Sequence, residues 1–330
     1  MQMRRLGRTD IDVSVVAFGC WGIVGGENWG PQDRQDSVAA LRAAYDGGVT
    51  FFDTAELYGD GYSEQLLAEA LSDVRDRIVI ASKAASTHFA PAELREACER
   101  SLRHLRTDRI DLYQLHWPNW EIPVGEVLAV LAELKQEGKI RAYGVSNFGK
   151  QDLGECLATG HPIASNQLAY SLLFRAIEYE IRPLCEQAGV SILCYSPLMQ
   201  GLLGGKYSRP EEFPVERART RHFSCERPPA RHSEPGAEAE TFEVLAGLRE
   251  LATEIGESMA DVSLAWLLAQ PAVTAVIAGA RNAVQARRNL RAGSLVLPER
   301  MLQRLADLTE PLKRKLGPNA DMWQTESRIR

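Results

Sequence analysis

The sequence of 330 residues lacks the features that mark several large classes of protein. Its six cysteines are scattered, with no C-x-x-C pair and no metal-site spacing, so neither a disulfide framework nor a bound metal is expected. No hydrophobic run approaches the length of a membrane span. A net charge of −6, with both signs mixed along the chain, gives no support for a nucleic-acid or membrane partner. These absences leave a globular cytoplasmic protein with reduced thiols.

Two common phosphate-binding signatures are also missing. The glycines between positions 19 and 30 do not have the G-x-G-x-x-G spacing of a dinucleotide fold, and a flexible active-site loop explains them better. Gly205 and Lys206 resemble the end of a Walker loop. However, Gln200 stands where that loop needs its first glycine, and Tyr207 replaces its hydroxyl residue.

What the sequence does contain is an alternation of β-branched runs and helix-period stretches, repeated about eight times, which is typical of a parallel sheet built from βα units. A β-hairpin is predicted within residues 1–14. The predicted strands that follow are Val15–Gly19, Val49–Asp53, Ile78–Ser82, Ile110–His116, Ile140–Val145, Ile163–Gln167, Val190–Tyr195 and Thr274–Ile277. We therefore expect one α/β domain over residues 1–330, a (β/α)8 TIM barrel with long loops at its C-terminal face.

Helices are expected between most of these strands, and two segments interrupt this alternation of strands and helices. The predicted helices are Arg34–Asp46, Pro91–Leu105, Val124–Gln136, Tyr179–Ala188, Glu240–Ile255, Met259–Ala269 and Ala283–Ala292. Residues 196–239 are rich in proline and charge, and such a long irregular segment indicates a functional loop over the cofactor and substrate. Residues 312–330 are expected to form a C-terminal tail.

Polar residues stand at the ends of three predicted strands that would be neighbours in the barrel. Asp53, Lys83 and His116 end or follow these strands, and Tyr58 lies in the short loop after Asp53. Because the C-terminal ends of barrel strands meet on one face, these side chains should lie close together. Asp53 and Lys83 are one βα repeat apart and can form a buried ion pair, for which a purely structural salt bridge remains the alternative.

These four residue types suit the reduction of a carbonyl group. A phenol has a pKa near 10 and is a poor acid at neutral pH unless a cation stabilises its phenolate. Lys83, held by Asp53, would supply that cation to Tyr58, which then becomes a usable proton donor. His116 would hydrogen-bond the carbonyl oxygen and orient it, although a histidine alone at such a place is more often structural.

Segments along nearly the whole chain resemble the aldo-keto reductase family, in particular its bacterial branch with an extended C-terminal tail. The matching segments are FFDTAELYG, ASK, LYQLHWP, GKIRAYGVSNF, SNQLAYS, YSPLMQGLLGGKY and SLAWLLAQPAVTAVIAGARNAVQARRN. The resemblance implies a catalytic tetrad in which Tyr58 is the acid, Lys83 tunes it, Asp53 holds Lys83 and His116 positions the substrate.

The resemblance also implies NADP(H) as the cofactor. Its expected contacts are Ser146, Asn147, Gln167 and Tyr195 around the nicotinamide, with Trp21 beside it; Ser196, Leu198, Gly201 and Leu203 around the pyrophosphate; and Gly279, Arg281, Gln285 and Asn289 around the adenosine. Arg281 would bind the 2′-phosphate, which favours NADP(H) over NAD(H), while a solvated charge at a helix start is the alternative. Arg288 replaces a glutamate common in the family, so the contact to the adenine amino group stays open.

The substrate pocket is expected around Trp21, Tyr58, His116, Trp117 and Trp323, although each tryptophan alone is as well explained by packing. The loop after His116 has no basic side chain to clamp an anion, which favours neutral or aromatic carbonyl compounds over carboxylates. The sequence does not specify which small carbonyl compound binds, nor the oligomeric state.

The predicted function is therefore NADPH-dependent reduction of aldehydes or ketones to alcohols by hydride transfer from the nicotinamide, with tyrosine as the general acid. Two alternatives remain at this stage. One is a cofactor-sensing regulatory subunit with little turnover. The other is a sugar or polyol dehydrogenase that runs in the oxidative direction, because the same four residues serve both directions.

Overall fold

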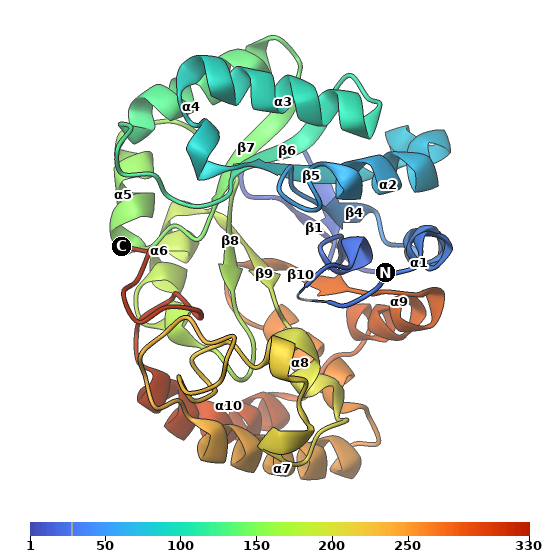
Figure 1. The fold of residues 1–330 in the computed structure, drawn as a ribbon, viewed down its shortest axis with the longest axis vertical. Helices are drawn as coiled ribbons and strands as arrows, with labels where there is room; N and C mark the ends of the chain where they lie inside the picture. The colour runs from blue at the N-terminus through green and yellow to red at the C-terminus, as the bar shows by residue number, and fades with distance from the viewer. Residues whose placement is uncertain (28) are drawn as a thin grey trace.

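The chain folds into a closed barrel of parallel strands surrounded by helices (Figure 1). The computed structural model describes residues 1–27 and 29–330. Within these residues the strands follow the order β10-β3-β4-β5-β6-β7-β8-β9 around the barrel. The predicted (β/α)8 fold is therefore confirmed.

The barrel strands agree with the predicted segments to within a few residues. They are β3 Val16–Gly19, β4 Phe51–Asp53, β5 Val79–Ala84, β6 Ile110–Leu115, β7 Ile140–Ser146, β8 Ser165–Ala169, β9 Ser191–Tyr195 and β10 Val273–Gly279. The hairpin β1 Met3–Arg5 and β2 Asp12–Ser14 pairs antiparallel. Leu6, Ile11 and Val13 of this segment join the cluster of buried side chains inside the barrel, so the hairpin closes its N-terminal end.

Helices cover the outside of the barrel. They are α1 Arg34–Asp46, α2 Tyr62–Leu71, α3 Pro91–Leu105, α4 Val124–Gln136, α5 Lys150–Ala158, α6 Ile181–Ala188, α7 Glu238–Glu254, α8 Met259–Leu268, α9 Ala283–Asn289 and α10 Glu299–Leu316. Short 3-10 turns are Gly22–Val24, Ser72–Arg77, Ser86–His88, Ala176–Glu178, Met199–Gly204, Pro210–Glu212, Val215–Arg217 and Leu290–Gly293. Helices α2, α5 and α10 have no counterpart among the predicted helices.

Helix α10 also changes where the tail begins. The sequence places the start of the tail at residue 312, but the helix continues through Pro311, a residue type that usually interrupts helices. The helix ends at Leu316, and the irregular tail starts at Gly317. Helix starts elsewhere follow ordinary capping chemistry: the Asp33 carboxylate, for example, accepts the first N–H groups of α1.

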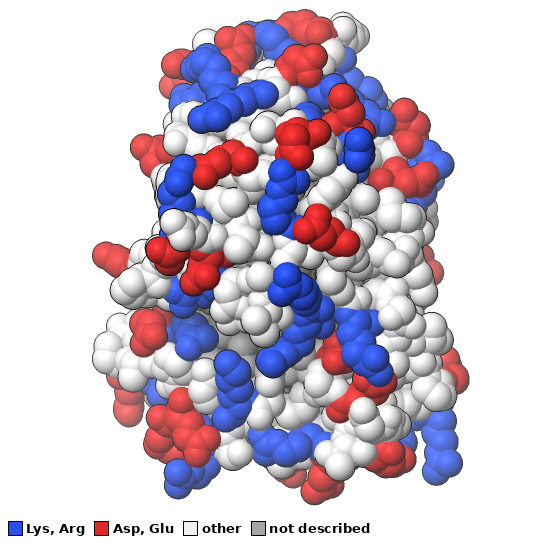
Figure 2. Space-filling view, turned by 90° about the vertical axis from the view of Figure 1, so that its right-hand side faces the viewer, with Lys and Arg blue, Asp and Glu red and all other residues white. Residues whose placement is uncertain are grey.

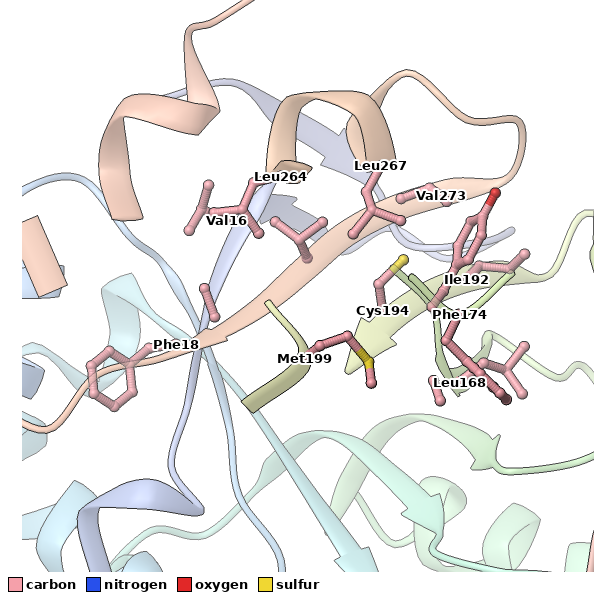
Figure 3. Close-up of a cluster of buried hydrophobic side chains, with 14 of the residues drawn as sticks. Val16, Phe18, Leu168, Phe174, Ile192, Cys194, Met199, Leu264, Leu267 and Val273 are labelled. Carbon is pink, nitrogen blue, oxygen red and sulfur yellow. The ribbon is translucent and has the colours of Figure 1, made fainter. Parts of the chain in front are cut away.

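The larger part of the hydrophobic core lies between the strands and the helices. Figure 3 shows Val16, Ile192, Cys194 and Val273, which belong to β3, β9 and β10, together with Leu264 and Leu267 of α8. Neighbouring positions on the same strands, such as Ala17, Leu193 and Ala275, face the barrel interior instead. This alternation is what a closed barrel covered by helices requires.

Two irregular segments meet above the C-terminal end of the barrel. The loop after β9 runs from residue 196 to the start of α7, and the tail runs from 317 to 330. The tail, red in Figure 1, crosses to α5, where the Arg330 carbonyl oxygen accepts bonds from the N–H groups of Gln151 and Asp152. No helix in the described part of the chain is long and apolar enough to cross a membrane.

Candidate active site

The four residues of the predicted tetrad meet at the C-terminal end of β4, β5 and β6. Asp53 is the last residue of β4, Lys83 lies one residue before the end of β5, and His116 directly follows β6. The Lys83 ammonium donates to Asp53 Oδ1 at 2.7 Å and to the Thr54 carbonyl at 2.8 Å. It lies 3.4 Å from the Tyr58 hydroxyl. The lysine side chain is 0% exposed, and the Asp53 carboxylate balances its charge inside the protein.

Tyr58 is held between two other rings. Trp21, which follows β3, stacks on it with ring centroids 6.1 Å apart, and His116 meets it edge-on at 5.8 Å. The turn that carries Tyr58 is fixed by backbone bonds from its N–H to Ala55 and from the Ser63 N–H to its carbonyl. The phenol hydroxyl is therefore aimed at Lys83 by packing on both sides.

Burial and charge act in opposite directions on this group of residues. Burial alone would lower the pKa of Lys83, but the Asp53 carboxylate and Tyr58 together outweigh it, so the pKa is raised and the ammonium persists. For Tyr58, burial raises the pKa, while the Lys83 charge acts in the lowering direction. The phenol is thus protonated at neutral pH and has a cation beside it.

His116 is neutral. Burial, and then the Lys83 charge, lowers the pKa of His116 to about 3. Its ring Nδ1 is buried and has no hydrogen-bond partner among residues 1–27 and 29–330. Its backbone is fixed, because the carbonyl accepts from the Asn147 side chain at 3.0 Å. A neutral imidazole with a spare nitrogen suits a hydrogen bond to a small molecule.

The side chains predicted around the nicotinamide form one hydrogen-bonded chain that reaches the tetrad. Tyr195 Oη donates to Asn147 Oδ1 at 2.8 Å, Asn147 Nδ2 lies 3.2 Å from Ser146 Oγ, and Ser146 Oγ donates to the Gln167 carbonyl at 3.0 Å. Gln167 Nε2 then donates to Asp53 Oδ2 at 2.7 Å. Each Asp53 oxygen therefore has its own donor, and the contact from Gln167 is one that the family resemblance does not imply.

Left-handed backbone conformations are concentrated at the predicted cofactor segments. Asn147 has φ 63°, Ser196 has φ 49° and Gln200 has φ 54°, and each such non-glycine residue costs about 1–2 kcal/mol. The Gln200 amide is buried, and neither its nitrogen nor its oxygen has a partner in the described part of the chain. Strained backbone and an unpaired buried amide are what a site shaped for a ligand shows. These residues fit a bound dinucleotide.

The residues predicted around the adenosine run from Gly279, the last residue of β10, to Asn289, the last residue of α9. Arg281 Nε donates to the Gln32 side chain at 2.7 Å, a second bond runs to the Pro31 carbonyl, and the Arg281 N–H donates to Gln285 Oε1 at 2.9 Å. Asn289 Nδ2 donates to the Gly279 carbonyl at 3.1 Å. The predicted set is therefore assembled between α9 and the loop before α1.

The surface around α9 carries further basic side chains. Arg287, Arg288 and Arg291 are all exposed there. Figure 2 shows this side of the molecule, with Lys and Arg residues gathered below its centre. An anionic group at the start of α9 would thus meet a positive local field.

The tryptophans of the predicted substrate pocket take different places. Trp21 lies in the ring stack with Tyr58, as described above. Trp117 packs against the tail, where the Arg328 guanidinium lies 3.9 Å from its ring centroid. Trp323 lies beside Tyr195 and forms a hydrogen bond with its side chain. Burial, and then the charge of Asp321, raise the pKa of Tyr195, while the hydrogen bond with Trp323 acts to lower it.

The structure also brings in a residue that the sequence analysis missed. The Arg219 guanidinium, from the long loop, lies 5.3 Å from the Trp21 ring centroid and 4.8 Å from that of Trp323. The expected preference for neutral carbonyl compounds rests on the loop after His116 alone, which has no basic side chain. The available signal was the run of arginines at alternate positions, Arg217, Arg219 and Arg221, in a segment otherwise rich in proline.

Comparisons with known proteins agree with this architecture. The model of the "Aldo/keto reductase family" matches residues 15–310. The aldo-keto reductase YhdN of Bacillus subtilis is 33% identical over 297 residues, covering 86% of each chain. The NADH-specific methylglyoxal reductase of Escherichia coli is 32% identical over 332 residues, covering 94% of this chain and 98% of the relative.

Solved structures show the same likeness. An aldo-keto reductase from Klebsiella pneumoniae in complex with NADPH superposes with a TM-score of 0.73 and 31% identity, covering 93% of this chain and 96% of that one. A family match over most of the chain, together with relatives above 30% identity over nearly their full length, shows that this chain belongs to the aldo-keto reductase family.

Proposed function

We propose that the protein is an NADP(H)-dependent oxidoreductase that reduces an aldehyde or ketone to the alcohol in the cytoplasm, with Tyr58 as the general acid. The observation that carries this proposal is the buried Lys83 ammonium, bonded to Asp53 at 2.7 Å and placed 3.4 Å from the Tyr58 hydroxyl. A structural salt bridge alone would not account for a partly exposed phenol and a neutral histidine whose ring Nδ1 has no partner among the residues that the structure describes, both at the same point.

Each residue has a separate task in this proposal. The nicotinamide, when bound, supplies the hydride. Tyr58 donates its proton to the carbonyl oxygen, and Lys83 stabilises the phenolate that is left. Asp53 keeps Lys83 charged and in place, while His116 donates a hydrogen bond that orients the carbonyl oxygen. Because these groups are already fixed by the barrel, little reorganisation accompanies the step.

Cofactor binding would use the residues assembled at the ends of β7, β8, β9 and β10. Ser146, Asn147, Gln167 and Tyr195 would hold the nicotinamide, and the segment of Ser196, Leu198, Gly201 and Leu203 would wrap the pyrophosphate. Its left-handed turn at Gly201, with φ 102°, lets backbone N–H groups approach phosphate closely. Gly279, Arg281, Gln285 and Asn289 would hold the adenosine.

The test is a titration of purified protein with NADPH and with NADH, followed by the loss of reduced-nicotinamide absorbance in the presence of a panel of aldehydes. We expect tight NADPH binding and oxidation by at least one aldehyde. Tight binding without any turnover would overturn the reductase and favour a cofactor-sensing role instead. Binding of neither cofactor would overturn both.

The preference for NADPH over NADH is the finer part of the proposal, because one solved neighbour binds NADPH while one relative is NADH-specific. Arg281→Ala should weaken NADPH binding about 10- to 100-fold, the usual cost of losing a charged hydrogen bond, and leave NADH binding nearly unchanged. Arg287→Ala, which removes an exposed arginine from the helix that follows Arg281, is the matched control. Equal losses for both cofactors in Arg281→Ala would remove the 2′-phosphate assignment.

A further inference from the structure

Glu56 is a buried carboxylate in the turn that carries Tyr58. It lies two residues before Tyr58, and it is only 6% exposed. Its Oε1 accepts a hydrogen bond from the Ala85 N–H at 2.6 Å. Ala85 follows Lys83 by two residues, directly after β5. The Glu56 side chain therefore bridges the turn of the proposed proton donor and the segment that holds the lysine.

Two further side chains hold the Glu56 carboxylate at this place. Arg100 of α3 donates to its Oε2 at 2.6 Å, and His88 Nδ1 lies 2.9 Å from its Oε1. Burial acts to raise the pKa of Glu56, but the hydrogen bonds that the carboxylate accepts outweigh this effect, so the pKa is lowered. The carboxylate is ionised at neutral pH, and its bond from the Ala85 N–H is therefore of the stronger, charge-assisted kind.

The backbone alone attaches this turn to β5 less tightly. The Glu56 N–H donates to the Lys83 carbonyl at 3.3 Å, which is long for a bond of this type. The Thr54 carbonyl accepts from the Lys83 ammonium at 2.8 Å, but this bond depends on the lysine side chain itself. The Glu56 carboxylate thus makes the shortest of these three connections between the turn and the end of β5.

The separation of Tyr58 and Lys83 is sensitive to where the turn lies. The Tyr58 hydroxyl and the Lys83 ammonium are 3.4 Å apart, close to the upper limit of a hydrogen bond. The rings of Trp21 and His116 confine the phenol from its sides, whereas the distance to Lys83 follows the turn. A displacement of about 1 Å at a reacting group can slow a reaction about 10²-fold.

We propose that Glu56 is a positioning residue for the proton transfer, because its bond with the Ala85 N–H sets the distance between the Tyr58 hydroxyl and the Lys83 ammonium. This rests on the proposed reductase function and adds to it a residue outside the four that the family resemblance implies. The competing explanation is that Glu56 only stabilises the fold through its ion pair with Arg100.

Two substitutions of Glu56 separate these explanations, because one keeps the reach of the side chain and the other keeps its charge. Glu56→Gln has the same length and an oxygen that can accept from Ala85, but it is neutral. Glu56→Asp is charged and can pair with Arg100, but it is shorter by one methylene group. The quantity measured is the rate of NADPH oxidation in a single turnover with saturating aldehyde, which excludes product release.

The positioning role predicts that reach matters more than charge. The single-turnover rate should stay within a few-fold of the natural rate in Glu56→Gln and should fall about 10- to 100-fold in Glu56→Asp, with NADPH affinity nearly unchanged in both. A role in the ion pair alone predicts the opposite order. Ala85→Pro removes the N–H donor from the other side, at a residue whose φ of −64° suits proline, and it should slow the step as Glu56→Asp does.

Glu178→Asp is the matched control. The Glu178 side chain is 5% exposed and pairs with Arg175 at 2.8 Å and with Lys313 at 2.9 Å, between the segment after β8 and α10. Shortening this carboxylate should lower the free energy of unfolding and leave the single-turnover rate nearly unchanged. A loss of rate in this variant equal to that in Glu56→Asp would mean that the rate only reports general destabilisation, and it would overturn the proposal.

Crystal structures separate the proposal from failure of the reductase itself. The Tyr58 hydroxyl and the Lys83 ammonium should lie farther apart in Glu56→Asp and in Ala85→Pro than in the natural protein or in Glu56→Gln, whether or not an aldehyde is reduced. This order of distances in a protein that oxidises NADPH with no aldehyde would overturn the reductase and keep the positioning role. Equal distances in every variant that folds, or a slower step in Glu56→Gln than in Glu56→Asp, would overturn the positioning role.

Discussion

The wall and the cover of the site are built in different ways. The wall is the set of strand ends that carry Asp53, Lys83 and His116, and the cover is made of residues 205–237 and 317–330. In the wall, neighbouring strands bring charged groups together, as the pairing of Asp53 with Ala81 brings Lys83 close. In the cover, arginine side chains bond backbone carbonyls far along the chain, as Arg221 does with Leu316.

This difference separates chemistry from selectivity. A strand end cannot move without breaking the barrel, so the groups proposed to transfer a proton stay fixed. The cover is fixed by a few charged side chains, and we expect substitutions there to change which substrate is bound without moving Tyr58 or Lys83. Loops on a rigid barrel commonly divide the work in this way.

The largest expected effect comes from the wall. Lys83→Met leaves Asp53 as a buried carboxylate without its cation, which should lower the free energy of unfolding by about 3–5 kcal/mol. Turnover should fall about 10²- to 10⁴-fold, because the phenolate of Tyr58 loses its stabilising charge. Denaturant titration and steady-state kinetics measure the two effects.

A double variant, Asp53→Asn with Lys83→Met, separates stability from chemistry in this experiment. Removing both charges should restore much of the stability, and turnover should remain low. If turnover recovered along with stability, the ion pair would be structural and Lys83 would have no part in proton transfer.

A smaller effect is expected from the cover. Arg221→Met removes the bonds to Leu316 and Asn319 and the ion pair with Glu234, and it should cost about 2–3 kcal/mol of stability. The tail should also become more sensitive to limited proteolysis, while an aldehyde that the natural protein reduces should still be turned over at nearly the natural rate. Arg227→Met is the matched control, because Arg227 is in the same loop but stacks on Phe223 and pairs with Glu238. A large loss of turnover in Arg221→Met alone would mean that the cover positions the wall.

The most gradual effect is on pH stability, and both regions contribute to it. The pKa of His116 in the wall is lowered to about 3, and the pKa of His222 in the cover is lowered to about 4, in both cases first by burial. The unfolded chain, with histidine pKa values near 6.5, therefore binds more protons than the folded one. Stability should be complete above about pH 6.5 and should fall as the pH drops toward 4, by up to about 1.4 kcal/mol per pH unit for each histidine.

Two single variants assign this slope. His222→Asn and His116→Asn should each reduce the dependence of the unfolding free energy on pH over that range, measured by denaturant titration at several pH values. An unchanged slope in both would show that carboxylates alone cause the acid sensitivity.

The wall could be predicted from the sequence because its residues lie at the ends of consecutive strands. Once Val49–Asp53 and Ile110–His116 are recognised as strands, the barrel leaves one place for their polar ends. The Gln167 bond to Asp53 was not predicted, since it depends on the rotamer of a side chain on β8, four strands away from β4 around the barrel. Helix α10 was missed across Pro311, a residue whose effect depends on the surrounding packing.

The cover could not be predicted in the same way. Arg219 and Trp323 are about a hundred residues apart, and nothing in the local pattern of either indicates that they touch. Their contact depends on the clamp from Arg221 to Leu316 and Asn319, which exists only after the barrel has brought loop and tail together. Long-range contacts between irregular segments carry no periodic signal.

The most direct test of the proton-transfer step is the comparison of Tyr58→Phe with the natural protein, in which turnover of an aldehyde and the affinity for NADPH are measured on the same samples. We expect turnover to fall at least about 10²-fold, the usual contribution of a general acid, with NADPH affinity nearly unchanged. Turnover close to the natural rate, or a loss of NADPH binding that accounts for the whole decrease, would contradict the role of Tyr58 as the proton donor.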